Sequence, residues 1–302
     1  MKNIRFEGNV NADLQIPGSK YIANRALPLA AMAEGTSIIR NIPLNNDIMR
    51  AIEAYRALGV KIDLDGNQAT VVGNAGNFPE LDTEIDCGES GTLMRFITGV
   101  ACLAGDNIRI TGSPRIQERP VGELVDSLGQ LGARIDRENG ECPPIVIKSS
   151  SLKGGKTEID GSKSSQFISA LLLVAPYARE DVEIEILGKS VSSSYIDLTC
   201  EIIDEFGVKI EQNGPKNYLI KSGQTYQSRD FTIPTDWSTA NFFFAAAALT
   251  GGKVSIDKLD LHTSQGESSF IDVLEKMGCK VDKKEGEVTL EGTTRLKGIN
   301  VD

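Results

Sequence analysis

The sequence has 302 residues, of which 40% are hydrophobic and 25% charged, a composition typical of a soluble globular protein with room for two domains and not of a disordered chain. Its 42 acidic and 32 basic residues give a net charge of -10, so the surface as a whole repels nucleic acid and anionic lipid, and we expect neither as a partner. Any anionic ligand must therefore meet a local basic pocket.

Metal, nucleotide and secretion signals are weak in this sequence. It holds one histidine, His262, and five cysteines without a C-x-x-C pair, which argues against a zinc site and against a histidine-based triad. No dinucleotide or Walker fingerprint occurs, so we expect no cofactor. The opening segment MKNIRFEGNV has no apolar signal-peptide core, and no stretch approaches about eighteen apolar residues. We therefore expect a reducing, cytoplasmic location.

A short strand that ends in turn-forming residues recurs along the chain, and we predict that each copy opens a repeat. The copies contain Ile16, Ile85, Ile159 and Ile233, at intervals of 69, 74 and 74 residues. A helix rich in small residues follows each strand, and we predict these helices at residues 26–33, 92–104, 167–178 and 240–250.

A second helix in each repeat ends in a glycine that leads into a strand pair. These glycines are Gly59, Gly132, Gly207 and Gly278, and each is expected to adopt a left-handed conformation that ends its helix. The repeating unit is therefore βαβαββ, present four times, which predicts an α/β (α+β) fold without specifying a function.

The first helix of each repeat begins with glycine or hydroxyl residues, at positions 18–20, 88–92, 161–165 and 235–238. Such residues can simply cap the helix, or the unpaired amides of the helix start can bind a phosphate or carboxylate. Basic residues stand nearby in the sequence: Lys20, Arg25, Arg95, Arg115 and Arg119. Together they favour a pocket for a multiply charged anion, although isolated arginines such as Arg25 and Arg119 are often only solvated surface residues.

Four segments make the chain similar to one enzyme family. Residues 17–27 (PGSKYIANRAL) resemble P-G-S-K-S-x-S-N-R-A-L, and residues 88–96 (GESGTLMRF) resemble G-E-S-G-T-x-x-R. Residues 160–167 (DGSKSSQF) match D-G-S-x-S-S-Q-F, and residues 192–197 (SSSYID) resemble S-x-P-Y-I-D with Ser194 in place of proline. In this order, they resemble the motifs of the EPSP synthase (3-phosphoshikimate 1-carboxyvinyltransferase) family across essentially the whole chain.

The resemblance implies an enzyme without a cofactor that transfers the enolpyruvyl group of phosphoenolpyruvate to the 5-hydroxyl of shikimate 3-phosphate in aromatic amino acid biosynthesis. It also implies two domains of three βαβαββ units each. Residues 19–231 would form a complete upper domain, and residues 1–18 plus 232–302 an incomplete lower domain.

The resemblance also implies site residues. Phosphoenolpyruvate is expected at Lys20, Gly91, Thr92, Arg115 and Gln166, with Lys20 catalytic and Gly91 lining the site where glyphosate competes. Shikimate 3-phosphate is expected at Tyr21, Arg25, Ser164, Ser165, Gln166, Ser192 and Tyr195. Tyr21 departs from the family, which has a serine at this position.

The family's pattern continues beyond position 302, so we expect a chain that lacks the C-terminal third, including an acidic pair that handles protons. Residues 296–302 are expected to be a strand that leads onward. Two alternatives follow: a poor catalyst or non-catalytic anion-binding relative, or a half that depends on a separate C-terminal fragment. A UDP-N-acetylglucosamine enolpyruvyl transferase is a further alternative, which the absence of cysteine from residues 111–117 disfavours. The last alternative is a structural repeat protein whose helix starts are only capped and which binds no ligand.

Overall fold

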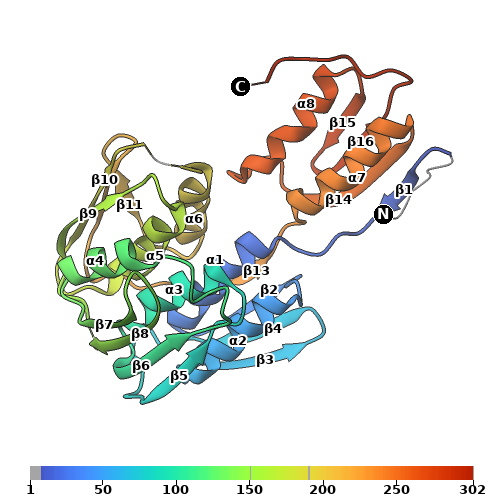
Figure 1. The fold of residues 1–302 in the computed structure, drawn as a ribbon. Helices are drawn as coiled ribbons and strands as arrows, with labels where there is room; N and C mark the ends of the chain where they lie inside the picture. The colour runs from blue at the N-terminus through green and yellow to red at the C-terminus, as the bar shows by residue number, and fades with distance from the viewer. Residues whose placement is uncertain (1–7, 150, 190, 302) are drawn as a thin grey trace. The chain divides into compact units, whose positions relative to one another are not determined.

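The computed structural model describes residues 8–149, 151–189 and 191–301 (Figure 1). The chain divides into two compact units, which we call unit 1 (Met1–Ser19 and Ile233–Asp302) and unit 2 (Lys20–Thr232). Unit 2 is thus continuous in sequence, whereas unit 1 is assembled from both ends of the chain.

Unit 2 contains three four-stranded sheets, each with its own pair of helices. The first repeat consists of α1 (Lys20–Met32), β2 (Thr36–Arg40), α2 (Asn46–Ala57), β3 (Lys61–Asp65), β4 (Gln68–Val72) and the distant β13 (Asp230–Thr232). The second consists of β5 (Thr83–Asp86), α3 (Gly91–Ala101), β6 (Gly105–Thr111), α4 (Gly122–Gln130), β7 (Ile135–Asn139) and β8 (Cys142–Ser149). The third consists of β9 (Gly155–Asp160), α5 (Ser165–Val174), the 3-10 turn η1 (Ala175–Tyr177), β10 (Val182–Leu187), α6 (Ser194–Glu205), β11 (Ile210–Gln212) and β12 (Asn217–Ile220).

Unit 1 contains a fourth sheet of the same kind. Its elements are β1 (Asn11–Leu14), α7 (Trp237–Thr250), β14 (Lys253–Leu259), the 3-10 turn η2 (Gly266–Ser269), α8 (Phe270–Lys276), β15 (Lys280–Lys284) and β16 (Gly286–Glu291). In all four sheets the first strand is parallel to the second and the remaining pairings are antiparallel. The predicted βαβαββ repeat and α/β fold are therefore confirmed.

Two leading strands are exchanged relative to the sequence order. The strand near Ile16 was expected to open the repeat that contains α1, but β1 ends at Leu14 and pairs with β14 in unit 1. The repeat that contains α1 receives β13 instead, which runs parallel to β2. The prediction from periodicity was wrong here, because periodicity locates equivalent strands without showing which sheet each strand joins. The family resemblance instead groups residues 1–18 with residues 232–302.

The glycine that follows each second helix behaves as predicted. Gly59, for example, has φ +83°, a conformation that side-chain-bearing residues rarely adopt. The next amide, Val60 N, donates to Tyr55 O at 3.1 Å, which closes the helix end. The same arrangement recurs at Gly132, Gly207 and Gly278.

The first helices of unit 2 begin side by side because they pack closely. Helix α3 packs on both α1 and α5. At Gly99 a Cβ atom would lie 3.0 Å from Ala170 O of α5, so glycine permits the close approach of these two helices. The polar first turns of α3 and α5 are thereby brought together.

Residues 296–301 adopt no strand, so the prediction of an outgoing strand was wrong for these residues; Asp302 lies outside the described part. Leu296 packs on the core of unit 1 instead, and Lys297 N donates to Met277 O. No helix in the described ranges is long and apolar enough to span a membrane.

Candidate functional site

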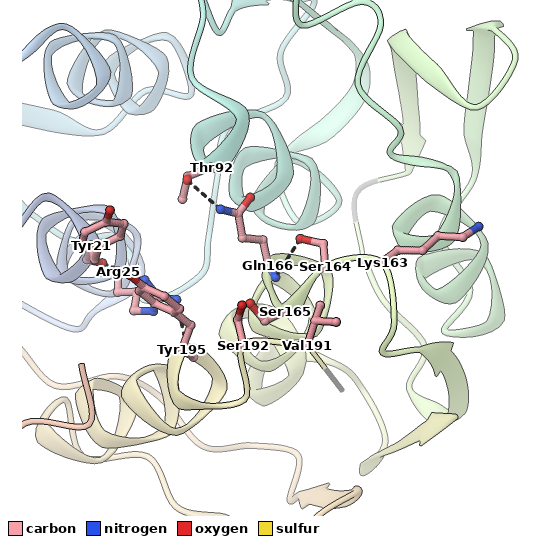
Figure 2. A pocket seen from close by; sticks show the side chains of 10 residues that line it. All are labelled: Tyr21, Arg25, Thr92, Lys163, Ser164, Ser165, Gln166, Val191, Ser192 and Tyr195. Atoms are coloured by element: carbon pink, nitrogen blue, oxygen red, sulfur yellow. Dashed lines mark hydrogen bonds between the residues drawn. The ribbon is translucent and has the colours of Figure 1, made fainter. Parts of the chain in front are cut away.

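A cavity of about 350 Å³ in unit 2 lies where the first turns of several helices converge (Figure 2). Helices α1, α3, α5 and α6 and the loops that precede α5 and α6 supply its walls. The lining residues are Tyr21, Arg25, Thr92, Lys163, Ser164, Ser165, Gln166, Val191, Ser192 and Tyr195. This set includes every residue predicted for shikimate 3-phosphate, although those residues are spread over more than half of the sequence.

Hydroxyl groups at the helix starts act as caps, as one interpretation of the sequence predicted. Ser90 Oγ accepts from Leu93 N at 3.3 Å in α3, and Ser164 Oγ accepts from Gln166 N at 3.2 Å in α5. A serine hydroxyl has acceptor lone pairs and one hydrogen to donate, and capping occupies only an acceptor. Ser164 can therefore cap α5 and still donate to an anion in the cavity.

Arg25 is a buried cation at the cavity wall. It is 2% exposed, so the surface interpretation of this arginine was wrong. Its guanidinium donates to Thr199 Oγ1 at 2.7 Å, Tyr21 O at 2.8 Å and Tyr195 O at 3.0 Å. Burial lowers the pKa of Arg25 to about 10, which leaves the group charged at neutral pH. In the described ranges no carboxylate pairs with it, so the charge remains available to an anionic ligand.

Two tyrosines form the aromatic wall of the cavity. The ring centroids of Tyr21 and Tyr195 are 5.1 Å apart, with the planes tilted by 49°. Lys20 is adjacent to Tyr21 in the sequence. Its Nζ lies 5.5 Å from the Tyr21 ring centroid and 3.8 Å from Asp47 Oδ2. The Lys20 side chain is 44% exposed and is not among the residues that line the cavity.

A hydrogen-bonded chain joins α3 to α5 at the wall of the cavity. Arg95 Nη1 donates to Gln166 Oε1 at 2.5 Å, and Gln166 Nε2 donates to Thr92 Oγ1 at 3.1 Å (Figure 2 shows the second bond). Arg95 is 8% exposed, and its guanidinium carbon lies 5.2 Å from the ring centroid of Phe167. Burial and the nearby charge of Arg119 lower the pKa of Arg95 to about 10. The sequence indicates Arg95 only as a basic residue near a helix start and does not predict its contact with Gln166.

Arg119 lies beside Gly91, at the start of α3. A Cβ atom on Gly91 would be 3.2 Å from Arg95 Nη1 and 3.4 Å from Arg119 Nη1. Arg115, which was predicted to contact phosphoenolpyruvate, is exposed on the same loop. Ile116, which lies between the two arginines in the sequence, is fully buried, and Arg119 N donates to Ile116 O in a turn. This turn directs Arg119 toward Gly91, a placement that sequence spacing alone does not reveal.

Lys163 and Val191 line the cavity without having been predicted. Lys163 pairs with Glu123 at 2.5 Å and follows Ser162 in the loop before α5. Among the described residues no group of histidine, cysteine or acidic side chains is arranged to hold a metal ion.

Comparisons with known proteins identify sequence relatives of this chain. The family model of EPSP synthase (3-phosphoshikimate 1-carboxyvinyltransferase) matches residues 4–302. A 3-phosphoshikimate 1-carboxyvinyltransferase of Sulfurovum sp. (strain NBC37-1) is 42% identical over 100% of this chain and 71% of its own length. The protein of the same name in Trichormus variabilis is 40% identical over 97% of this chain and 70% of its own length.

A solved structure is similar in fold. The EPSP synthase from Acinetobacter baumannii superposes with a TM-score of 0.84 and 22% sequence identity, covering 97% of this chain and 67% of that one.

Proposed function

The chain belongs to the EPSP synthase family, and from this premise we propose that the cavity of unit 2 binds shikimate 3-phosphate. The enzymes of this family transfer the enolpyruvyl group of phosphoenolpyruvate to shikimate 3-phosphate in aromatic amino acid biosynthesis. The transfer forms a bond between the 5-hydroxyl oxygen and C2 of phosphoenolpyruvate and breaks the bond from C2 to the phosphate oxygen. Inorganic phosphate leaves and, in the net reaction, takes up the hydroxyl proton.

One observation carries the proposal for the acceptor: the predicted shikimate 3-phosphate residues all line a single cavity. Ser164, Ser165 and Ser192 offer hydroxyl donors there, and the amides at the start of α5 favour a phosphate. Arg25 adds a buried positive charge that no described carboxylate neutralises. Tyr21 and Tyr195 supply apolar surface against which the carbon ring of the acceptor can pack.

The donor site is proposed at the start of α3, beside the acceptor cavity. Gly91 leaves room for phosphoenolpyruvate at a helix start that attracts anions. Arg119 and Lys20 are the cations proposed to hold this substrate, the first as a forked donor and the second as a point charge. Lys20 is also proposed to be the catalytic cation that stabilises the charge developing during transfer. Arg115 remains a proposed contact of phosphoenolpyruvate, with its side chain exposed.

Isothermal titration of the chain with shikimate 3-phosphate tests the acceptor site. Shikimate, which lacks the phosphate, is the matched control ligand. We expect shikimate 3-phosphate to bind and shikimate to bind much more weakly, because the serine hydroxyls and the start of α5 are placed for a phosphate. Equal affinity for the two ligands would contradict the proposed role of the serines.

Phosphate release from phosphoenolpyruvate in the presence of shikimate 3-phosphate tests the transfer. Lys20→Ala is the control, since it removes the ammonium while leaving the cavity lining unchanged. Release that depends on Lys20 supports the assignment of its role, and release that persists in Lys20→Ala overturns it.

A partner-dependent form of this function is the second candidate, and the exposed face of α7 favours it. Phe242 and Leu249 are seven residues apart, so they share one helix face, and they are 77% and 76% exposed. The equivalent helices of unit 2, α1, α3 and α5, are buried along nearly their whole length. We propose that this face of α7 packs against the helix of a further βαβαββ repeat, which would complete the lower domain.

Complementation tests this second candidate. The part of the Sulfurovum relative that the chain does not match is added, and phosphate release is followed with the wild-type chain and with Leu249→Asp. We expect release to increase with the wild type and not with the variant. An equal increase for both would show that the α7 face is not the docking surface.

We also propose that the chain works in the cytoplasm. All five cysteines are unpaired, and Cys87, Cys102 and Cys279 are buried, which suits a reducing compartment.

A further inference from the structure

We propose that Arg95 is a positioning residue: it fixes the orientation of the Gln166 amide and thereby makes Thr92 a hydrogen-bond donor toward an anionic oxygen of a substrate in the cavity. This inference rests on the proposed function, because the anionic oxygen is that of a substrate. The contacts of Arg95, Gln166 and Thr92 carry the argument.

The side chain of Arg95 decides which way the Gln166 amide faces. A guanidinium has only donors, so the Gln166 atom at 2.5 Å from Arg95 Nη1 must be the carbonyl oxygen. The amide nitrogen is then directed to Thr92 Oγ1, 3.1 Å away. A glutamine without such a partner could adopt either orientation, because the two ends of its amide have nearly the same shape.

The orientation of Gln166 determines in turn what Thr92 offers to the cavity. The Thr92 hydroxyl accepts from Gln166 Nε2, and in the described ranges its own hydrogen has no acceptor. Thr92 lines the cavity, so this hydrogen is free to donate to a ligand. Each bond in the chain from Arg95 to Gln166 to Thr92 runs in the same direction, and such chains polarise one another. The chain therefore presents donors to an anion.

The surroundings of Arg95 argue against a purely structural role. The side chain is 8% exposed, its Nε is buried without a partner, and no carboxylate of the described residues pairs with it. The charge of Arg119 nearby adds repulsion. A buried cation in this situation destabilises the fold, and an apolar side chain of similar size is often at least as stable. A bound anion would offset both the free-energy cost of burying the Arg95 charge and its repulsion by Arg119.

The first test needs no ligand. The side-chain amide signals of Gln166 are followed by ¹⁵N NMR in the wild-type chain, in Arg95→Met and in Arg95→Lys. We expect slow hydrogen exchange of the Gln166 amide in the wild type, faster exchange in Arg95→Met, and recovery in Arg95→Lys, which keeps a charged donor. Arg109→Met is the matched control because Arg109 pairs with Glu84 and Glu138 on an exposed sheet surface.

The second test compares affinity with stability in the same variants. We expect Arg95→Met to bind shikimate 3-phosphate about tenfold or more weakly, the loss expected for a hydrogen bond to a charged group, while its Tm equals or exceeds that of the wild type. Arg95→Lys should recover part of the affinity. A structural role would instead lower Tm and leave the affinity unchanged.

The results separate this inference from the proposed function. If the wild-type chain fails to bind shikimate 3-phosphate, the acceptor assignment is wrong and the inference falls with it, even where Arg95 still governs the amide exchange of Gln166. If the wild type binds and Arg95→Met changes neither the affinity nor the Gln166 amide exchange, the positioning role is overturned and the acceptor assignment stands.

Discussion

The guanidinium of Arg119 lies against the backbone of Gly91, with Nη1 3.4 Å from the position of a Cβ atom there. Gly91→Ala would place a methyl group in van der Waals contact with this arginine and 3.2 Å from Arg95 Nη1, so the Arg95 guanidinium must shift by a few tenths of an ångström. We expect a several-fold loss of phosphoenolpyruvate affinity and an unchanged affinity for shikimate 3-phosphate, both measured by calorimetry. An equal loss for both ligands would mean that the methyl disturbs the whole cavity.

Arg119 and Arg115 form a matched pair for a second prediction. Arg119→Met removes a charge beside Gly91, and we expect phosphoenolpyruvate affinity to fall by about tenfold or more, as for other hydrogen bonds to charged groups. Arg115→Met removes an exposed charge, and we expect a change smaller than about twofold. The affinities are measured with shikimate 3-phosphate saturating. The reverse ranking would restore the role that the sequence assigned to Arg115.

Tyr21 is predicted to act through its ring. The described contacts of its side chain are those of the ring with Tyr195 and Lys20, and its hydroxyl has no hydrogen-bond partner among the described residues. Tyr21→Phe should therefore bind shikimate 3-phosphate within about twofold of the wild type. Tyr21→Ser should bind about threefold to tenfold more weakly, since an aromatic contact contributes about 0.5–1.5 kcal/mol. If the phenylalanine variant is as weak as the serine variant, the hydroxyl is the contact.

Neighbouring phenylalanines of α7 should differ in their effect on stability. Phe244 is fully buried beside Trp237, whereas Phe242 is 77% exposed. We expect Phe244→Ala to cost about 3–5 kcal/mol and Phe242→Ala less than about 0.5 kcal/mol. Trp237 is the only tryptophan and lies in unit 1, so its fluorescence during urea unfolding reports on this unit. Equal losses in the two variants would mean that the Phe242 side chain is covered in solution.

Local signals in the sequence predicted much of the fold. Gly59 and Gly207 marked helix ends because a left-handed residue there is almost a glycine requirement. The starts of the first helices were predicted less well: α1 begins at Lys20, not at position 26. Its first turn includes Lys20, which is 44% exposed, and Tyr21, which lines the cavity, and this turn lacks the apolar periodicity on which the prediction depended. The periodicity alone did not reveal the strand exchange between β1 and β13, because pairing over such a distance leaves no periodic trace.

The site was predictable where short motifs bring residues together locally. Ser164, Ser165 and Gln166 are consecutive, and all three line the same cavity. The contact between Arg95 and Gln166 depends on the packing of α3 against α5, which no local pattern encodes. The choice between Arg115 and Arg119 depends in the same way on one turn of the chain.

The chain passes between the units twice, and the two segments at these points are hydrogen-bonded to each other within unit 1. Ser19 N donates to Pro234 O at 2.8 Å, Asp236 N donates to Pro17 O at 3.2 Å, and Gly18 bridges to Thr235. Residues 20–232 thus leave and re-enter unit 1 at neighbouring points, as an inserted domain does. Since β13 ends at Thr232 and completes the first sheet of unit 2, the insert carries all of its own strands. The insert could be excised and the remaining ends of unit 1 joined by a short linker. It could also be replaced by another domain with adjacent termini. Neither change removes a strand from unit 1 or from the insert.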